Sequence, residues 1–293
     1  MKVYVAEEAG FCFGVKRALE IIEQLHEQGH HVYTYGQLIH NRTVLDDLES
    51  KGIYAIDSPD QLNPKQTLVI RTHGISREIE TDLKTQNIAY VDATCPLVKR
   101  LQNVIRKLAA VDQRIVLVGD KQHPEIIAAV SYAGQSQPNT VILGSEAEAL
   151  ALEPSERMAV TAQTTLDSEF FDRIVSILKT KTKDLHVYNT ICKATRDRQD
   201  AIRKLAPTVD VVLIVGGKNS SNTAKLYKIA SAQNRHTFHI ESSRELEDPD
   251  FARRFQRFLS VGITAGASTP PDEIEKIKKY FNKLNIEKEM NHG

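Results

Sequence analysis

The chain has 293 residues, which is long for one hydrophobic core and favours two or three domains. The charges of its 38 basic and 38 acidic residues cancel. The chain therefore lacks the strong overall positive field that is typical of proteins that bind nucleic acids or anionic membranes. The N-terminal apolar stretch is too short for a secretory signal, and no apolar run approaches the roughly 18 residues of a membrane span, so we expect a cytoplasmic protein.

The apolar periodicity predicts that strands alternate with helices along the whole chain. We expect strands at residues 2–6, 31–35, 53–56, 67–71, 88–91, 114–118, 140–143, 158–161, 185–188, 211–215, 237–240 and 259–264. We expect helices after Cys12, at about 43–51, 76–85, 97–108 and 168–179, from about 125, up to about 207, from about 222, and at 272–284. This alternation is typical of α/β folds with parallel sheets.

A cysteine stands at the same place in each third of the chain, after a strand and at the start of a helix. These are Cys12, Cys95 and Cys192, the only cysteines of the protein. The repetition predicts three similar α/β domains with small, mainly parallel sheets, arranged as a pseudo-threefold trefoil that brings the cysteines together. We expect domains at residues 13–95, 96–192 and 193–284, with a tail at 285–293.

The last third of the chain supplies one strand fewer than the other two. Its predicted strands number three, whereas each of the first two thirds has four. The N-terminal strand at residues 2–6 is the remaining candidate, so residues 1–12 are assigned to the third domain. We therefore predict that this strand joins the sheet formed by the end of the chain.

The three cysteines match no local CxxC pattern of zinc or ferredoxin-type sites, and three buried structural cysteines are the plain alternative. Their equivalent places favour a shared metal site, because a helix start and a basic residue four positions later both favour thiolates. The basic residues are Lys16, Lys99 and Arg196. Three thiolates are one short of the usual ligand set of a 4Fe–4S cluster, so one iron would keep an open position and could act as a Lewis acid.

Polar residues follow the other strands at repeated offsets and predict a site for a phosphorylated ligand at the carboxyl ends of the sheets. They are His40, His73, His123, Thr164, Ser220, Ser221, Asn222 and Ser268. The plain alternatives are solvated histidines and ordinary helix caps. The string Gly216-Gly217-Lys218 is not a Walker A loop, and His123-Pro124-Glu125 lacks the downstream P-C-x-x-C of zinc deaminases.

Glu125 is the one carboxylate in these loops that lies between a candidate ligand and a helix start. A buried acid there could supply a proton to a leaving hydroxyl. The alternative is an ordinary first-turn acid that complements the helix dipole.

Short strings along nearly the whole chain resemble the hydroxymethylbutenyl diphosphate reductase family, also called the LytB family. The strings are Ala9-Gly10-Phe11-Cys12-Phe13-Gly14-Val15, His40-Asn41, Arg71-Thr72-His73-Gly74, Asp92-Ala93-Thr94-Cys95-Pro96, His123-Pro124-Glu125, Gln163-Thr164-Thr165, Thr190-Ile191-Cys192, Ser220-Ser221-Asn222 and Thr264-Ala265-Gly266-Ala267-Ser268. Several are weak alone, but in this order and number they are highly specific.

The resemblance implies an iron–sulfur oxidoreductase of isoprene biosynthesis, at the last step of the methylerythritol phosphate pathway. It implies one 4Fe–4S cluster held by Cys12, Cys95 and Cys192, and reductive loss of the hydroxyl of an allylic diphosphate to give isopentenyl and dimethylallyl diphosphate. Reduced ferredoxin or flavodoxin is the implied electron donor. Glu125 and Thr164, with His123, are implied in proton delivery. His40, His73, His123, Ser220, Ser221, Asn222 and Ser268 are implied in diphosphate binding.

Two other functions fit parts of the pattern. A redox-sensing iron–sulfur protein without turnover would use the three cysteines but would need no diphosphate site. A three-domain module that binds zinc or phosphate would use the polar residues without redox chemistry.

Overall fold

The computed structural model describes residues 1–63, 65–111 and 113–291. They form two compact units. Unit 1 comprises residues 1–15, 39–48 and 193–293, and unit 2 comprises residues 16–38 and 49–192. Among the described residues, none of the helices combines the length and apolar character that a membrane span needs.

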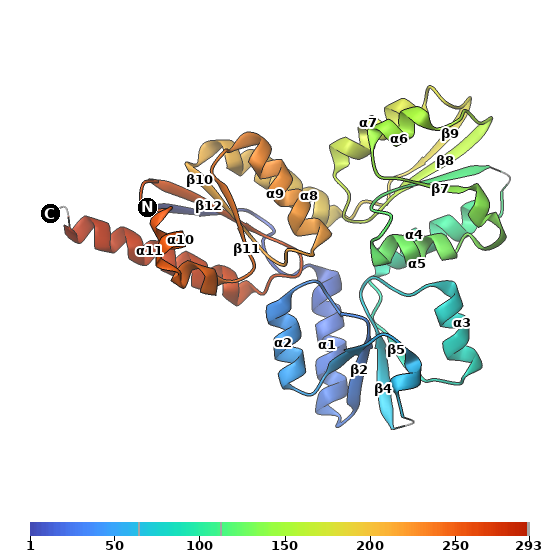
Figure 1. The fold of residues 1–293 in the computed structure, drawn as a ribbon, viewed down its shortest axis with the longest axis horizontal. Helices are drawn as coiled ribbons and strands as arrows, with labels where there is room; N and C mark the ends of the chain where they lie inside the picture. The colour runs from blue at the N-terminus through green and yellow to red at the C-terminus, as the bar shows by residue number, and fades with distance from the viewer. Residues whose placement is uncertain (64, 112, 292–293) are drawn as a thin grey trace. The chain divides into compact units, whose positions relative to one another are not determined.

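Three four-stranded sheets form in the described part of the chain, and all of their strand pairs are parallel (Figure 1). The first sheet has the order β3 (Tyr54–Ile56), β2 (His31–Tyr35), β4 (Gln66–Ile70), β5 (Tyr90–Asp92). The second has the order β7 (Thr140–Leu143), β6 (Arg114–Val118), β8 (Arg157–Ala162), β9 (Asp184–Tyr188). The third has the order β1 (Lys2–Val5), β12 (Ser260–Ala265), β10 (Val211–Val215), β11 (Thr237–Ile240).

Helices lie between most of these strands along the chain, and one more helix follows the last strand. They are α1 (Phe13–Glu27), α2 (Arg42–Ser50), α3 (Arg77–Thr85), α4 (Pro96–Leu108), α5 (Pro124–Ser131), α6 (Glu146–Ala151), α7 (Ser168–Leu178), α8 (Lys193–Leu205), α9 (Ser221–Gln233), α10 (Pro249–Arg253) and α11 (Pro271–Asn291). The α/β class and the three small parallel sheets that the sequence predicts are confirmed. The boundaries of three separate domains stay a prediction, because unit 2 holds two of the sheets.

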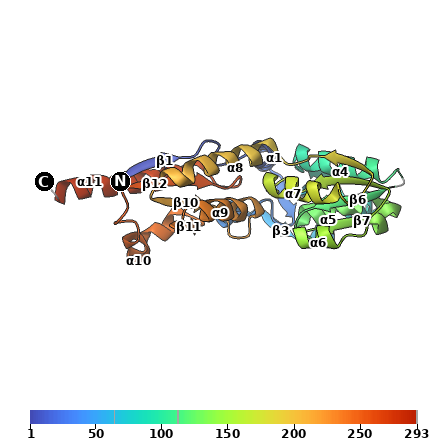
Figure 2. The same ribbon diagram turned by 90° about the horizontal axis from the view of Figure 1, so that it is seen from above.

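The N-terminal strand pairs with the last strand of the chain, as the strand count in the sequence predicts. In unit 1, β1 lies parallel to β12, with Lys2 opposite Ser260 and Val5 opposite Ile263 (Figure 2). The edge of β12 is thereby covered, and the third sheet reaches the same four strands as the other two. The start of the chain is thus held in a sheet made otherwise by its last third.

Strand β10 is apolar at every position because it is buried on both faces. Leu213 and Val215 pack with Phe281 of α11 on one face, and Val212 and Ile214 pack with helices α8 and α9 on the other. A central strand of a doubly covered parallel sheet has this continuous apolar run rather than an alternating one.

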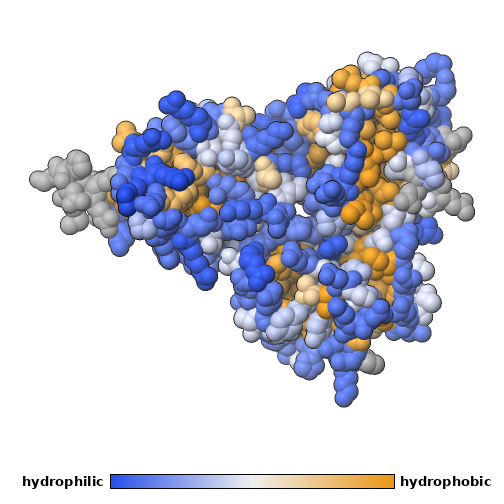
Figure 3. Space-filling model, in the orientation of Figure 1, coloured by the Kyte–Doolittle hydropathy of each residue, from blue (hydrophilic) through white to orange (hydrophobic). Residues whose placement is uncertain are grey.

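The face of the molecule in Figure 3 is hydrophilic over most of its area, with apolar residues in patches between polar ones.

Three helices differ from the sequence prediction. Helix α11 continues to Asn291, so the predicted tail at 285–293 is helical through residue 291, and residues 292–293 lie outside the described residues. Glycine and proline are absent from residues 285–291, which explains why the helix does not end earlier. Helices α6 and α10 were not predicted, because they are too short to show an apolar repeat. A capping signal does mark α6, since Ser145 accepts a hydrogen bond from the N–H of Glu148.

The core of unit 1 depends on an aromatic cluster around Phe255, which is fully buried. Its ring centroid lies 5.2 Å from that of Phe238, 5.4 Å from Phe251 and 5.1 Å from Phe281. We expect Phe255→Ala to lower the free energy of unfolding by about 3–5 kcal/mol, because it leaves a cavity among these rings. Chemical denaturation followed by circular dichroism measures the change. Leu259→Ala is the control, since Leu259 is 80% exposed and its loss should change stability by less than about 0.5 kcal/mol.

Asp210 links the starts of β10 and β12. Its carboxylate accepts hydrogen bonds from the backbone N–H groups of Leu259 (2.9 Å) and Ser260 (2.8 Å) and from the Ser260 hydroxyl (3.0 Å). These bonds, the Leu259 bond first, lower the pKa of Asp210. A lowered pKa in the folded chain contributes stability above the ordinary pKa, and this contribution is lost as the pH falls through the lowered value.

We therefore expect Asp210→Asn to weaken the dependence of stability on pH below about pH 4, where aspartate ordinarily titrates. Urea denaturation of both proteins between neutral and acidic pH measures this dependence. Identical pH profiles for the variant and the natural protein would show that Asp210 does not contribute in this way.

Candidate functional site

The three cysteines occupy equivalent positions in the structure as well as in the sequence. In unit 1 the backbone N–H of Cys12 donates to the carbonyl of Ala267 at 3.0 Å. In unit 2 that of Cys95 donates to Thr72 at 3.0 Å, and that of Cys192 to Thr164 at 2.9 Å. Each acceptor lies in the loop after the strand that neighbours the cysteine's own strand. Each cysteine is therefore tied at the carboxyl end of its sheet, where α/β folds bind ligands.

The surroundings of the cysteines fit thiolate ligands. All three lie in the described part of the chain, are partly exposed and form no disulfide. Helices α1, α4 and α8 each begin at the residue directly after a cysteine. A helix N-terminus stabilises a thiolate through its dipole and its unpaired N–H groups. The donor set is therefore chemically suited to a thiophilic metal or an iron–sulfur cluster.

Lys99, one of the basic residues predicted to support the thiolates, forms an ion pair with a neighbouring carboxylate. Its Nζ lies 2.6 Å from Oδ2 of Asp92. Burial by itself would raise the pKa of Asp92, but hydrogen bonds from Lys99 and Thr94 together lower it. The charge of Lys99 is thus largely balanced by Asp92, which weakens any effect on Cys95.

Glu125 is held by the loop that follows β8. Its side chain is only 1% exposed. The backbone N–H of Thr164 donates to Oε1 at 2.7 Å, and the Thr164 hydroxyl donates to Oε2 at 2.7 Å. The carboxyl group is therefore engaged by Thr164 rather than solvated at the start of α5. The pair can move a proton, because a hydroxyl both donates and accepts.

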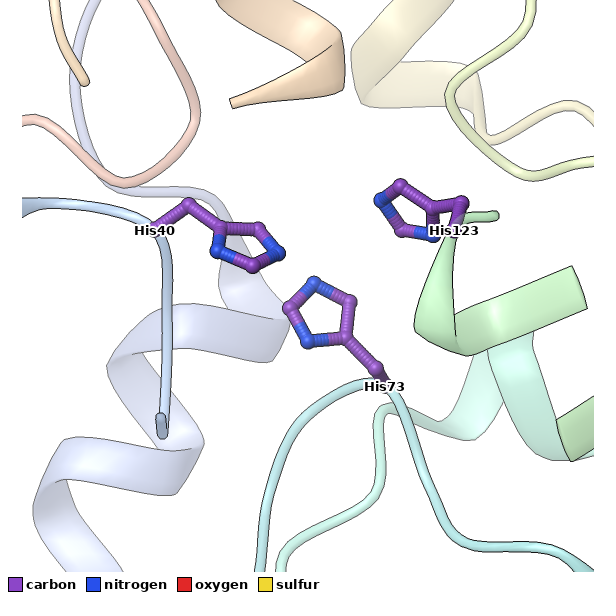
Figure 4. A group of neighbouring side chains, drawn as sticks. All are labelled: His40, His73 and His123. Carbon is purple, nitrogen blue, oxygen red and sulfur yellow. The ribbon is translucent and has the colours of Figure 1, made fainter. Parts of the chain in front are cut away.

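His123 and His73 lie side by side in unit 2. His123 caps α5, with its Nδ1 accepting a hydrogen bond from the N–H of Glu125 at 3.2 Å. The ring of His73, from the loop after β4, meets that of His123 edge to face with centroids 5.3 Å apart (Figure 4). Unit 2 thus brings together two of the predicted ligand histidines and the Glu125–Thr164 pair. His40, also drawn in Figure 4, belongs to unit 1.

Unit 1 brings together the remaining predicted ligand residues. The Ser268 hydroxyl donates to the carbonyl of His40 at 3.2 Å. A side chain at Gly217 would place its Cβ 2.3 Å from the same carbonyl, so only glycine allows this approach. Ser220 caps α9 by accepting a hydrogen bond from the N–H of Thr223 at 3.3 Å, and Ser221 accepts one from Lys225. The N-terminus of α9 therefore lies in the same unit as His40 and Ser268.

Asn222 has a buried amide that makes no hydrogen bond to the described residues. It is 4% exposed, and neither Nδ2 nor Oδ1 has a hydrogen-bond partner among the described residues. Burying such groups is costly unless something binds them. Nδ2 of Asn41 is in the same state, although its Oδ1 accepts a hydrogen bond from Val44 at the start of α2. The site residues predicted from the sequence did not include Asn41, and the preference of asparagine for helix starts indicates only its capping role.

We expect Asn222→Leu to leave the ligand-free protein as stable as before or up to about 2 kcal/mol more stable, because the buried amide makes no hydrogen bond to the described residues. Asn234→Leu is the matched control. The Asn234 side chain donates to the carbonyls of Ala206 (3.0 Å) and Val209 (2.8 Å) and accepts from the N–H of His236 (2.9 Å). Losing these hydrogen bonds should lower the free energy of unfolding by about 1–3 kcal/mol. Denaturation curves that show equal losses for the two variants would contradict the assignment of Asn222 as a ligand group.

Comparison with known proteins gives full-length matches. The family model described as LytB protein matches residues 3–282. The 4-hydroxy-3-methylbut-2-enyl diphosphate reductase of Thermoanaerobacter sp. (strain X514) is 41% identical over 291 residues, covering 98% of this chain and 99% of that protein. The reductase of the same name from Aquifex aeolicus (strain VF5) is 39% identical over 283 residues, covering 96% of each chain.

Solved structures are similar over comparable lengths. The E-1-hydroxy-2-methyl-but-2-enyl-4-diphosphate reductase from Plasmodium falciparum is 28% identical with a TM-score of 0.87, covering 96% of this chain and 87% of that one. A structure of (E)-4-hydroxy-3-methyl-but-2-enyl diphosphate reductase is 38% identical with a TM-score of 0.67, covering 97% of this chain and all of that one.

Proposed function

This chain belongs to the LytB protein family, and we propose that it is a 4-hydroxy-3-methylbut-2-enyl diphosphate reductase. The proposal rests first on relatives of that name at about 40% identity over nearly the whole chain. The observation in the structure that carries the chemistry is the buried Glu125, with both carboxyl oxygens engaged by Thr164. A reaction that releases water from a substrate hydroxyl needs a proton source of this kind.

The reaction consumes two electrons and two protons and breaks one carbon–oxygen bond. One proton completes the water that leaves from the hydroxyl, and the other adds to a carbon of the allyl group. Depending on that carbon, the product is isopentenyl or dimethylallyl diphosphate. We assign the first proton to Glu125, with the Thr164 hydroxyl as its relay and His123 orienting the start of α5.

The diphosphate is assigned to residues that can donate hydrogen bonds without a large positive charge. These are His40, His73, His123, Ser220, Ser221, Asn222 and Ser268. Hydrogen bonds to a charged group contribute about 1.5–3 kcal/mol each, so several of them suffice to hold a small anion. The N-terminus of α9 adds its dipole.

The cofactor is assigned to the three cysteines. A 4Fe–4S cluster on Cys12, Cys95 and Cys192 would supply the electrons and, at its open iron, a Lewis acid for the hydroxyl. We further propose reduced ferredoxin or flavodoxin as the electron donor, the cytoplasm as the location, and three domains at residues 13–95, 96–192 and 193–284 with 1–12, arranged as a trefoil. A redox sensor without turnover has no use for the Glu125–Thr164 pair.

We expect Glu125→Gln to lower turnover of the diphosphate by at least about 100-fold, because the amide cannot supply the proton. Turnover is measured anaerobically with a chemical reductant, and the visible spectrum reports the cofactor in the same samples. Thr164→Ser keeps the hydroxyl and should stay within a few-fold of the natural activity, whereas Thr164→Val should not. Full activity of Glu125→Gln would remove Glu125 from the mechanism.

A further inference from the structure

Arg198 is a buried cation of unit 1 that the proposed reaction does not use. Its side chain is among the largest that are fully buried, and the residue is 2% exposed. It lies in α8, the helix that begins directly after Cys192. Nη1 donates to the carbonyl of Ala194 at 2.9 Å, and Nη2 donates to that of Gly10 at 2.6 Å. Burying a guanidinium is costly, so the hydrogen bonds that Arg198 makes indicate its role in the structure.

The contact with Gly10 fixes the segment that carries Cys12. Gly10 has φ +99°, a left-handed conformation that favours glycine, and an added Cβ would lie 3.3 Å from Ile274. Two residues later, the N–H of Cys12 is bound to Ala267. Arg198 and Ala267 therefore hold the backbone on both sides of Phe11, directly before the helix that starts at Phe13.

A second arginine makes the corresponding contact in unit 2. Arg17, in the helix that follows Cys12, donates to the carbonyls of Asp92 and Thr94, both at 3.4 Å. Thr94 directly precedes Cys95. In each unit an arginine of the helix after one cysteine thus donates to at least one carbonyl of the segment before another cysteine. The bond from Arg198 is much the shorter, which makes it the stronger of the two.

We propose that Arg198 is a positioning residue of the cysteine site: it fixes the Cys12 segment and places a permanent positive charge on the Cys12 side of that site. The inference rests on the proposed function, since it takes the three cysteines as cofactor ligands. A fixed segment slows loss of the cofactor, as outer contacts of metal ligands generally do. A buried positive charge favours the reduced, more negative state of a cluster.

The test compares Arg198→Met and Arg198→Lys with Ile202→Ala. Ile202 is fully buried on the same helix and packs against Val212 and Ile214, so its truncation destabilises unit 1 without touching the Cys12 segment. Each protein is loaded anaerobically. Iron release to a chelator, the midpoint potential and the thermal midpoint are then measured.

We expect Arg198→Met to release iron about 10–100-fold faster than the natural protein and to have a more negative midpoint potential. Arg198→Lys should restore most of the potential, because it keeps the charge, and Ile202→Ala should change only the thermal midpoint. If Arg198→Met and Ile202→Ala release iron at equal rates and share the natural potential, Arg198 is only a structural residue and the inference fails. A natural protein that binds no iron would instead overturn the proposed function.

Discussion

The structure depends on one repeated backbone contact, the hydrogen bond from each cysteine N–H to the loop after the neighbouring strand. Ala267, Thr72 and Thr164 supply the acceptors. The carboxyl ends of parallel strands lie at the same edge of a sheet, so this bond ties each cysteine to a loop that also carries a predicted polar ligand. Ser268 and His73 directly follow two of the acceptors, and Thr164 is itself an acceptor. Each residue that we propose as a cofactor ligand is therefore tied to a loop that carries a residue we propose for the substrate site.

The polar residues that we assign to the site would let a chain without net charge bind an anion. Hydroxyls, imidazoles, amides and a helix N-terminus can supply local donors, whereas two basic side chains near the cysteines already have partners of their own. Lys99 is paired with Asp92, and Arg198 with backbone carbonyls. The buried amide of Asn222, without a partner among the described residues, marks where a donor is held ready at the cost of stability in the ligand-free protein.

Most of the fold could be predicted because its signals are periodic. Continuous apolar runs such as 211–215 identify buried strands, and the missing strand of the last third correctly predicted the pairing of β1 with β12. The short helices α6 and α10 and the end of α11 could not be predicted from periodicity. For the site, the place of Glu125 between His123 and a helix start predicted a role for it, but only the structure reveals its hydrogen bonds with Thr164. No local sequence pattern connects Arg198 with Gly10, which lies far away along the chain.

We propose above that three cysteines hold a redox cofactor that acts on an allylic diphosphate. The most direct measurement is the electron paramagnetic resonance and visible spectrum of anaerobically reduced protein, with and without 4-hydroxy-3-methylbut-2-enyl diphosphate. We expect the signals of a bound iron–sulfur cluster and a change in them when the diphosphate is added. The signals should be lost when Cys12, Cys95 or Cys192 is replaced by serine. A protein without such signals after reconstitution, or with a spectrum that the diphosphate leaves unchanged while no product forms, would contradict it.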